Sequence, residues 1–287
     1  EVDAVSYSTV VHACTYAGEL ERALEWLDRM EAAGVEATAG TYAPLVHTVA
    51  RLDNIALVDQ LFERMEKAKV KVNRAMYNAL ISACGRTGDT GRAMKLINEM
   101  PALGCEPDLI SYNSVIDTHA RRGDVRRAEE WFDRIVKAGL EPDVVSYSSV
   151  LKACAKIGSL NSAEEWFRKM SDAGLKPNVI CYNAVVHTCS RANDLAGAED
   201  WVRRMEANGV PADTYTFNSL VSACVRCGDT DRAESYLRQM DREGVPLRAG
   251  MVTPLINAYT KAGKPARAKR WLREIHRRGV AREEPVA

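Results

Sequence analysis

The side chains of this sequence that could do chemistry recur at a fixed interval of 35 residues. Cations occupy one such position in seven of eight successive intervals, and Tyr16 stands in the remaining one. A regular line of cations suits a phosphate backbone better than it suits any single point ligand. Alternatively, these cations only offset the dipole at the ends of helices. The seven residues predicted to contact phosphate are Arg51, Arg86, Arg121, Lys156, Arg191, Arg226 and Lys261.

Two further positions of the same interval carry mostly small polar side chains, which can hydrogen-bond the edge of a nucleobase. The first position holds Ser8, Ala43, Asn78, Asn113, Ser148, Asn183, Asn218 and Thr253. The second position holds Thr38, Asn73, Asp108, Asp143, Asn178, Asp213, Arg248 and Glu283. Asn, Ser and Pro-Asp are also ordinary turn and cap residues at the start of a helix. Residue types alone therefore leave base recognition and helix capping both open.

The cysteines and histidines do not predict a metal site or a catalytic centre. Five of the eight cysteines share one position of the interval, where cysteine behaves as a small hydrophobic residue. Cys224 and Cys227 have the spacing of a metal or redox pair, but no second pair accompanies them. His12, His47 and His187 also share one position, so they lie in separate repeats and do not converge on one ion.

No catalytic constellation stands outside the repeat pattern. The sequence has no Gly-rich phosphate loop and no arrangement of Ser, His and Asp or of Cys and His that suits nucleophilic catalysis. We therefore predict no enzyme activity, no metal, no cofactor and no small-molecule substrate. Reduced thiols are expected, as in a reducing compartment.

Bulk composition is less informative than the distribution of residues. The 39 basic and 39 acidic residues balance, so net charge does not indicate nucleic acid. No long apolar run interrupts the period, and we expect no membrane segment. The sequence begins inside a repeat boundary, and we expect it to be a piece of a longer protein whose targeting peptide lies outside it.

A repeated helical hairpin positions these side chains. Tyr112, Val115 and Ile116 begin one apolar helix face, and Ala128, Trp131 and Phe132 begin a second one in the same unit. Glycine, or Asp53 and Asn193 in its place, separates the two helices. The predicted units are 4–38, 39–73, 74–108, 109–143, 144–178, 179–213, 214–248 and 249–283.

One hairpin cannot bury both apolar faces, but a stack of hairpins can. The fixed period therefore predicts an all-α fold, an α-solenoid of eight helix-turn-helix repeats, and we expect one continuous domain over residues 4–283. The five tryptophans share one position of the second helix, and six of the nine methionines share another. We interpret both series as core packing.

These residues resemble the pentatricopeptide repeat over essentially the whole chain. The unit carries Tyr-Asn, then Arg or Lys before Gly-Asp, then Ala-x-x-Trp-Phe, Met and Gly-x-x-Pro-Asp, in 35-residue copies as in the P-type subclass. The tetratricopeptide repeat has a period of about 34 and carries its Trp early in the unit. The resemblance implies a right-handed superhelix that binds single-stranded RNA, one base per repeat.

The resemblance also assigns roles to residues. The residue after the aromatic and the last residue of the unit together select the base, and an aliphatic side chain near the start of the unit stacks on it. The base-stacking residues are then Val5, Ile110, Val145 and Ile180. The base-selecting residues are Ser8, Thr38, Asn73, Asn78, Asp108, Asn113, Asp143, Ser148, Asn178, Asn183, Asp213 and Asn218.

The four central units then predict the sequence 5′-UUAU-3′, with the RNA running 5′ to 3′ from the N-terminal to the C-terminal repeats. The outer units depart from the family's pairs, because Ala43 cannot hydrogen-bond a base, and Arg248 and Glu283 are unusual at their position. Gly40 and Gly250 also replace the stacking side chain. We expect these units to add backbone contact and stacking rather than specificity.

The family further implies an organellar protein, of a chloroplast or a mitochondrion, that acts in RNA processing, stability or translation. Its predicted partners are single-stranded RNA and other RNA-processing proteins, and not a membrane. Two alternatives stay open. One is a protein-binding α-solenoid scaffold, and the other is an accessory segment of an enzyme whose catalytic domain lies outside this sequence.

Overall fold

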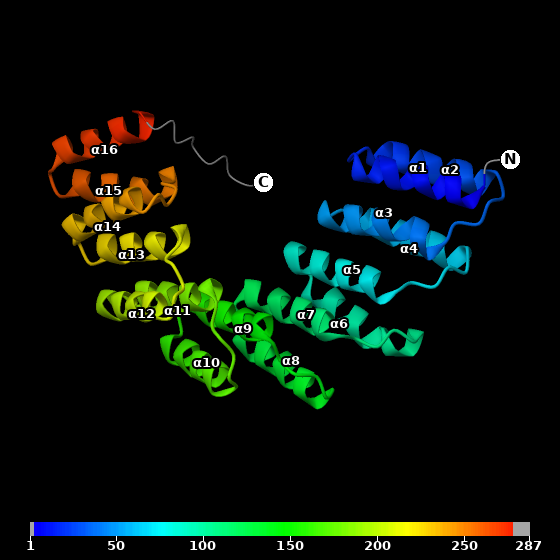
Figure 1. Ribbon diagram of the computed structural model, residues 1–287, viewed down its shortest axis with the longest axis horizontal. Coiled ribbons are helices and arrows are strands. Elements are labelled where there is room, and N and C mark those ends of the chain that lie inside the picture. The colour runs from blue at the N-terminus through cyan, green and yellow to red at the C-terminus, as the bar shows by residue number, and fades with distance from the viewer. Residues whose placement is uncertain (1–2, 278–287) are drawn as a thin grey trace. The chain divides into compact units, whose positions relative to one another are not determined.

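The computed structural model describes residues 3–277, and this part of the chain is entirely helical (Figure 1). It holds sixteen α-helices and one short 3₁₀-helix, and none of the described residues lies in a strand. The predicted all-α fold of helical hairpins is therefore confirmed. Residues 278–283, which complete the last predicted repeat and include Glu283, lie outside the described residues.

The described chain divides into two compact units, which meet in sequence between Pro142 and Asp143. The first unit contains α1 (Ala4–Tyr16), α2 (Leu20–Ala32), α3 (Ala39–Arg51), α4 (Ile55–Lys67), α5 (Arg74–Thr87), α6 (Thr90–Glu99), the 3₁₀-helix η1 (Pro101–Leu103), α7 (Leu109–Arg122) and α8 (Val125–Lys137). The hand of a superhelix and a single domain over residues 4–283 stay predictions.

The second unit repeats this organisation. It contains α9 (Val144–Ile157), α10 (Leu160–Asp172), α11 (Val179–Arg191), α12 (Leu195–Ala207), α13 (Thr214–Arg226), α14 (Thr230–Arg242), α15 (Ala249–Lys261) and α16 (Pro265–Arg277). Each predicted repeat thus holds one pair of helices, of which the odd-numbered helix comes first.

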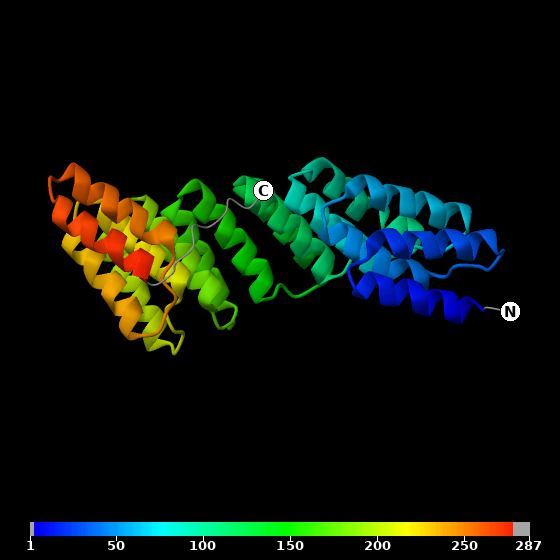
Figure 2. The same ribbon diagram turned by 90° about the horizontal axis from the view of Figure 1, so that it is seen from above.

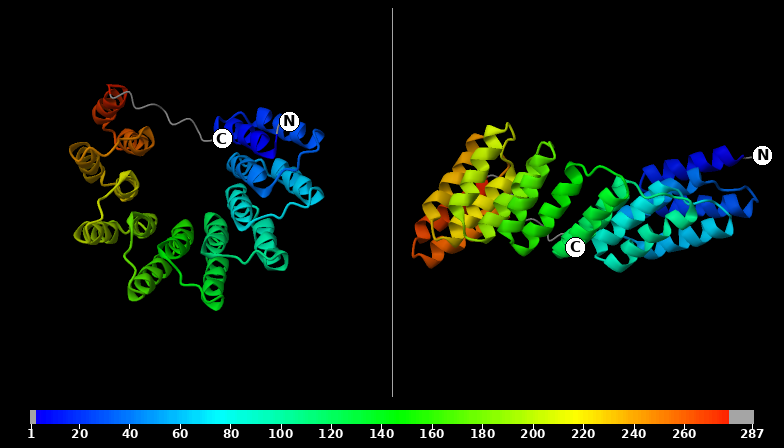
Figure 3. Two further views of the ribbon diagram at one scale, coloured as in Figure 1. Left: turned by 45° about the vertical axis from the view of Figure 1, so that its right-hand side comes forward. Right: turned by 90° about the horizontal axis from the view of Figure 1, so that it is seen from below.

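Within each unit the helices form two layers, one of first helices and one of second helices (Figures 2 and 3). Within a unit, each first helix packs on the first helix of the next repeat, as α3 on α5 and α11 on α13. Within either unit, Cα atoms of neighbouring second helices do not form such close contacts within 8 Å. Within a unit, each second helix instead packs on the first helix of its own repeat and of the next repeat, so the first helices are the more closely spaced layer.

The difference in spacing follows from side-chain size. The first helices bury many small residues, among them Ala83, Cys84, Ala153, Cys154 and Ser190, and at Gly85 a Cβ atom would lie 2.6 Å from Thr118 of the next first helix. Large side chains fill the second helices, where the six aligned methionines are fully buried. They are Met30, Met65, Met100, Met170, Met205 and Met240. Both the Met series and the buried Cys series are therefore core packing, as predicted.

The tryptophans also pack in the core. In four repeats the aromatic residue of the first helix meets the Trp of the second helix with ring centroids 6.0 to 6.4 Å apart. These pairs are Tyr7 with Trp26, Tyr112 with Trp131, Tyr147 with Trp166 and Tyr182 with Trp201. The spacing is that of favourable tilted and edge-on ring pairs. In these four repeats the ring pair joins the first helix to the second helix.

The predicted helix ends are confirmed. Gly88, Gly123 and Gly158 end their helices in the left-handed conformation. Asp53 and Asn193, which replace glycine, adopt the same conformation with φ of 55° and 61°. One second helix differs from its counterparts because Pro101 cannot continue it. There α6 ends at Glu99, and a 3₁₀ turn follows.

Candidate nucleic-acid interface

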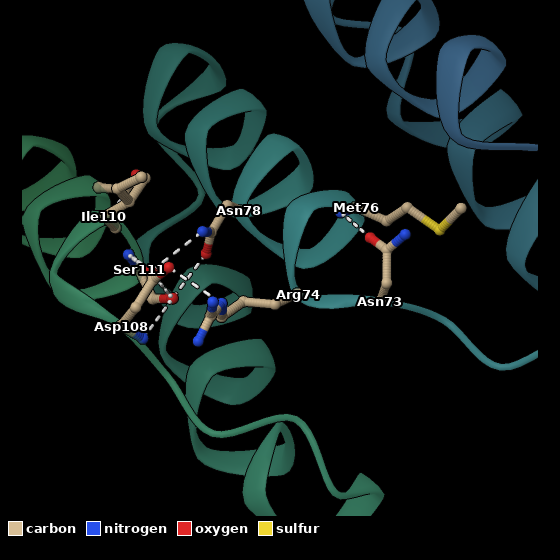
Figure 4. A network of polar contacts seen from close by, with 8 residues as sticks. Asn73, Arg74, Met76, Asn78, Asp108, Ile110 and Ser111 are labelled. Carbon is tan, nitrogen blue, oxygen red and sulfur yellow. Dashed lines mark hydrogen bonds and ion pairs between the residues drawn. The ribbon is translucent and has the colours of Figure 1, made fainter. Parts of the chain in front are cut away.

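The last residue of each repeat begins the next first helix, and this brings the two predicted base-selecting positions together. Asp108 is the N-cap of α7, while Asn78 lies in the first turns of α5. Because α5 and α7 pack side by side, the Asn78 Nδ2 donates to Asp108 Oδ1 over 3.1 Å (Figure 4). Two residues that are 30 positions apart therefore form one polar pair.

Neighbouring side chains hold this pair in place. The Ser111 hydroxyl lies 2.6 Å from Asn78 Oδ1, and the Ser111 backbone N–H donates to Asp108 Oδ1 over 3.0 Å (Figure 4). The other carboxylate oxygen, Oδ2, pairs with Arg74 Nε at 3.0 Å. Burial raises the pKa of Asp108, but the hydrogen bonds from Ser111 and Asn78 and the charge of Arg74 outweigh it, so the pKa lies below its usual value. Asp108 is therefore a carboxylate at neutral pH.

The same arrangement recurs in the second unit. Asn183 Nδ2 donates to Asp213 Oδ1 over 2.9 Å, and the Thr216 hydroxyl lies 2.6 Å from Asn183 Oδ1. Asp213 caps α13 through the backbone N–H of Thr216. The two sites share their geometry although Thr replaces Ser, because either hydroxyl forms the capping box.

The other predicted base-selecting residues divide between capping and helix-to-helix contacts. Asn73 caps α5 through Met76 N–H, and Asn178 caps α11 through the backbone N–H groups of Ile180 and Cys181. Ser148 donates to the carbonyl of Val145 in its own helix, and the structure gives no hydrogen bond between Ser148 and Asn178. Helix capping is thus correct for Asn73 and Asn178, the last residues of their repeats. Capping does not exclude that these side chains also contact a base.

In the first repeat a third residue joins the two predicted side chains. The Ser8 hydroxyl lies 2.8 Å from Thr41 Oγ1, which lies 3.4 Å from Thr38 Oγ1. In the fourth repeat, Asn113 belongs to the first unit and Asp143 to the second, where Asp143 caps α9 through Ser146 N–H. Asn113 is largely buried.

The predicted base-stacking residues are large apolar side chains that the fold leaves exposed. Val5, Ile110, Val145 and Ile180 are 71%, 63%, 52% and 42% exposed. Leu52, Val136 and Ile157 are exposed to a similar degree at other repeat positions, so exposure alone does not identify a stacking surface, and base stacking stays a prediction. Tyr215, which the sequence prediction did not include, occupies the same repeat position and is 64% exposed. Its alignment with Ile110 at a multiple of the period is the signal that could have found it.

One cavity of about 250 Å³ in the first unit collects residues of all three predicted classes. Its lining includes the base-selecting Asn78, the stacking Ile110 and the cationic Arg51 and Arg86, with His47 beside them. These residues come from three consecutive first helices, α3, α5 and α7. The layer of first helices therefore brings an amide, an exposed apolar side chain and cationic side chains together at one place.

The basic series serves a structural role at several positions. Arg86, Arg191 and Arg226 donate to carbonyl groups at the C-terminal end of the first helix of the preceding repeat. Arg86 Nε also pairs with Asp53 at 2.7 Å, and Arg121 Nε pairs with Asp117 at 2.8 Å. In the part of the chain that the structure describes, the side chains of Arg51, Lys156 and Lys261 form no hydrogen bond or ion pair. Contact with phosphate stays a prediction for all seven.

Other classes of site receive no support from the described residues. Residues 3–277 contain no group of three or more His, Cys, Asp or Glu side chains that could hold a metal ion. All eight cysteines are free thiols, and of these only Cys227 is exposed. No helix within this range is long and apolar enough to cross a membrane.

Several solved structures are similar to this chain. PPR10 in complex with an 18-nt psaJ RNA element is 23% identical, with a TM-score of 0.48 over 97% of this chain and 49% of that chain. The PPR domain of Arabidopsis thaliana protein-only RNase P 1, in complex with tRNA, is 14% identical, with a TM-score of 0.52 over 65% of this chain and 98% of that chain. The chain spans about half the length of the PPR10 chain.

Sequence families identify the repeat. The model described as the pentacotripeptide-repeat region of PRORP matches residues 3–164, more than half of the chain. A model described as pentatricopeptide repeat-containing protein matches residues 110–240, and the PPR repeat model matches residues 251–280. No curated protein matches. The 35-residue period, the hairpin fold and these matches agree, and the chain belongs to the pentatricopeptide repeat family.

Proposed function

We propose that this chain binds single-stranded RNA in a sequence-specific manner, one base per repeat, along the layer of first helices. The observation that carries this proposal is the cavity between α3, α5 and α7. There Asn78, whose amide is hydrogen-bonded to Asp108, lies with an exposed aliphatic side chain and two arginines. RNA-binding repeats use the same combination of groups, in which two or three side chains recognise each base.

The tethered pair has the chemistry that base selection needs. Free Asn side chains rotate, and their amides can present donor and acceptor in either order. Here Asp108 accepts from Asn78 Nδ2, and Ser111 lies against Asn78 Oδ1, so the order is fixed. A base edge that offers one acceptor and one donor can then be told from an edge with the opposite order, because a mismatch leaves polar groups unpaired.

The family's base-selecting residue pairs give the RNA sequence that we propose this chain binds. Asn78 with Asp108 and Asn183 with Asp213 favour uracil, and their matching geometry in the two units supports giving both the same base. Asn113 with Asp143 also favours uracil, and Ser148 with Asn178 favours adenine. The four repeats together propose 5′-UUAU-3′, with the 5′ end at the third repeat. The aliphatic residues from Val5 to Ile180 would stack on the bases.

Family membership also supports a place of action. We propose a role in a chloroplast or mitochondrion, in the processing, stability or translation of an organellar RNA. A clamped single strand would be shielded from exonucleases or held unpaired for another factor. Other RNA-processing proteins are the proposed further partners.

Fluorescence anisotropy with short labelled RNAs tests the proposal. An eight-nucleotide RNA centred on UUAU should bind more tightly than one centred on UUGU, by about tenfold, because a wrong base costs the discrimination of one good pair of hydrogen bonds. The same sequence as a blunt RNA duplex is the control and should not compete. If neither single strand binds above background at moderate salt, the polar series is capping chemistry and a protein-binding scaffold becomes the better account.

A further inference from the structure

The seventh repeat, residues 214–248, carries a different kind of group at a base-selecting position. Where the third and sixth repeats have the carboxylates of Asp108 and Asp213, it has Arg248, which begins α15 without a side-chain cap. A carboxylate only accepts hydrogen bonds, whereas a guanidinium only donates them. The chemistry that this repeat can offer a base is therefore inverted.

The aromatic ring of Tyr215 lies beside this guanidinium. The Arg248 guanidinium carbon is 6.0 Å from the centroid of the Tyr215 ring, which is the range of a cation–π contact. Tyr215 occupies the stacking position of the repeat and is exposed, and the Arg248 side chain is exposed as well. A base stacked on the exposed ring would therefore lie next to the guanidinium.

The amide of Asn218 completes the group. Asn78 and Asn183, its counterparts, are half-buried and donate to their Asp partners. Asn218 is exposed, and within the described residues the structure gives its side chain no hydrogen bond. A guanidinium cannot replace the Asp carboxylate as the acceptor for its amide N–H. The carbonyl and amino groups of Asn218 can both turn toward a ligand.

Resting on the RNA binding proposed above, we propose that the seventh repeat selects cytosine, at the nucleotide 3′ of UUAU. The base stacks on Tyr215, the forked donors of Arg248 bind its N3 and O2 atoms, and Asn218 Oδ1 accepts from its N4 amino group. A planar fork of donors needs two adjacent acceptors, and on the pairing edge cytosine alone offers them. Uracil and guanine present N–H at the central position, and adenine has an amino group beside its single acceptor.

The eighth repeat has no side chain at the stacking position, which makes the aromatic ring of Tyr215 more important. Gly250 occupies the next stacking position and has no side chain to cover the other face of the base. Tyr215 must therefore provide most of the stacking, and a ring offers more surface than an aliphatic side chain does. The earlier expectation that this repeat adds only backbone contact and stacking is replaced by a specific base preference.

Four RNAs that share UUAU and differ only in the next nucleotide test this proposal by fluorescence anisotropy. Wild-type protein should bind the RNA with C about tenfold more tightly than those with U, A or G, the discrimination of one bidentate pair. Arg248→Asp recreates the Asn–Asp pair of the third and sixth repeats and should move the preference to U. Arg242→Asp makes the same charge change on α14 and should leave the preference for C intact.

Tyr215→Ala separates stacking from base selection, because it should weaken all four RNAs by a similar factor while C stays preferred. Equal affinity for the four RNAs, with a uniform loss in Arg248→Asp, would show that Arg248 contacts phosphate only and would overturn the proposal. A preference for G would overturn it as well, since Arg248 would then bind the N7 and O6 edge of guanine. Failure of the proposed function is distinguishable, because then none of the four RNAs binds.

Discussion

At the scale of single residues, one side chain often serves both the fold and the site. Asp108 caps α7 through Ser111 N–H and fixes the amide of Asn78 with the same carboxylate oxygen. Residue type predicted both uses, but only the distance between α5 and α7 shows that they occur together. Arg226 is a second case, because the sequence marks it as a cation, whereas the structure shows it donating to the carbonyl and hydroxyl groups of Ser190.

A buried phenol in the last described repeat gives a prediction for pH dependence. The Tyr259 hydroxyl donates to Glu234 Oε2 over 2.6 Å. Burial, together with this carboxylate, raises the pKa of Tyr259 to about 12 from 10.0. A raised pKa means that the folded state holds the proton more tightly. The stability that the phenol contributes is therefore complete below about pH 10 and is lost as the pH rises through about 12.

Tyr259→Phe should then lower the free energy of unfolding by about 2 kcal/mol at neutral pH, as for a hydrogen bond to a charged group. Urea denaturation followed by circular dichroism measures the difference, which should shrink as the pH approaches 12. Tyr16→Phe is the matched control, because Tyr16 is 89% exposed, and it should change nothing. A loss of stability that is equal in the two variants would contradict the assigned hydrogen bond.

At the scale of helices, the close spacing of first helices brings together the residues of the proposed binding layer. A Cβ atom added at Gly85 of α5 would lie 2.6 Å from Thr118 Oγ1 on α7. Thr118 is fully buried and its hydroxyl donates to the carbonyl of Ser114, so its rotamer is fixed. Gly85 therefore sets the approach of the two helices that carry Asn78 and Asp108.

Gly85→Ala should destabilise the protein by about 1–3 kcal/mol, the usual cost of overpacking, although alanine favours a helix. Gly91→Ala is the control, since its Cβ would meet only Asp89 Oδ1 at 3.7 Å. It should stabilise the protein by about 0.5–1 kcal/mol through helix propensity alone. Thermal unfolding of both variants decides the matter, and a rise in Tm for Gly85→Ala would refute the close approach of α5 and α7.

Most of the helices and the turns between them were predictable from the sequence. The positions of Tyr112, Trp131 and Gly123 within the repeat predict two helices, their buried faces and the turn between them, because periodicity and cap chemistry are local. The end of α6 before Pro101 follows from the local sequence, because proline cannot continue the helix, but the repeat pattern alone does not show it. The hydrogen bond from Arg86 to the carbonyl of Ala50 and its ion pair with Asp53 were not predictable, because they depend on the distance between neighbouring helices.

At the scale of the whole molecule, the proposed RNA complex would add the contacts of successive repeats to one strand. Seven phosphate contacts would give a slope of at most about −5 for the logarithm of affinity against the logarithm of salt concentration. The division at Pro142 and Asp143 had no signal in the sequence, because the 35-residue period continues through it.

Salt titrations and unfolding should distinguish basic residues that only contact phosphate from those that also stabilise the fold. Arg51→Ala should reduce the salt slope by about 0.7, the share of one phosphate contact on a single strand, with little loss of stability. Arg226→Ala should in addition lower the free energy of unfolding, because Ser190 loses the donor that binds its carbonyl and hydroxyl groups. Anisotropy at several salt concentrations, paired with urea denaturation, measures both effects. An unchanged slope in Arg51→Ala would exclude that residue from the phosphate path.

The claim that residues at two repeat positions choose the base is tested most directly by exchanging one of them. Asn178→Asp should keep the cap of α11. Asp143 and Asp213 cap α9 and α13 through a side-chain oxygen, as Asn178 caps α11. Its affinities for RNAs centred on UUAU and on UUGU should be compared with those of the wild-type chain. The account predicts that wild-type protein prefers UUAU by about tenfold and that the variant prefers UUGU. Equal binding of both RNAs by both proteins would contradict it.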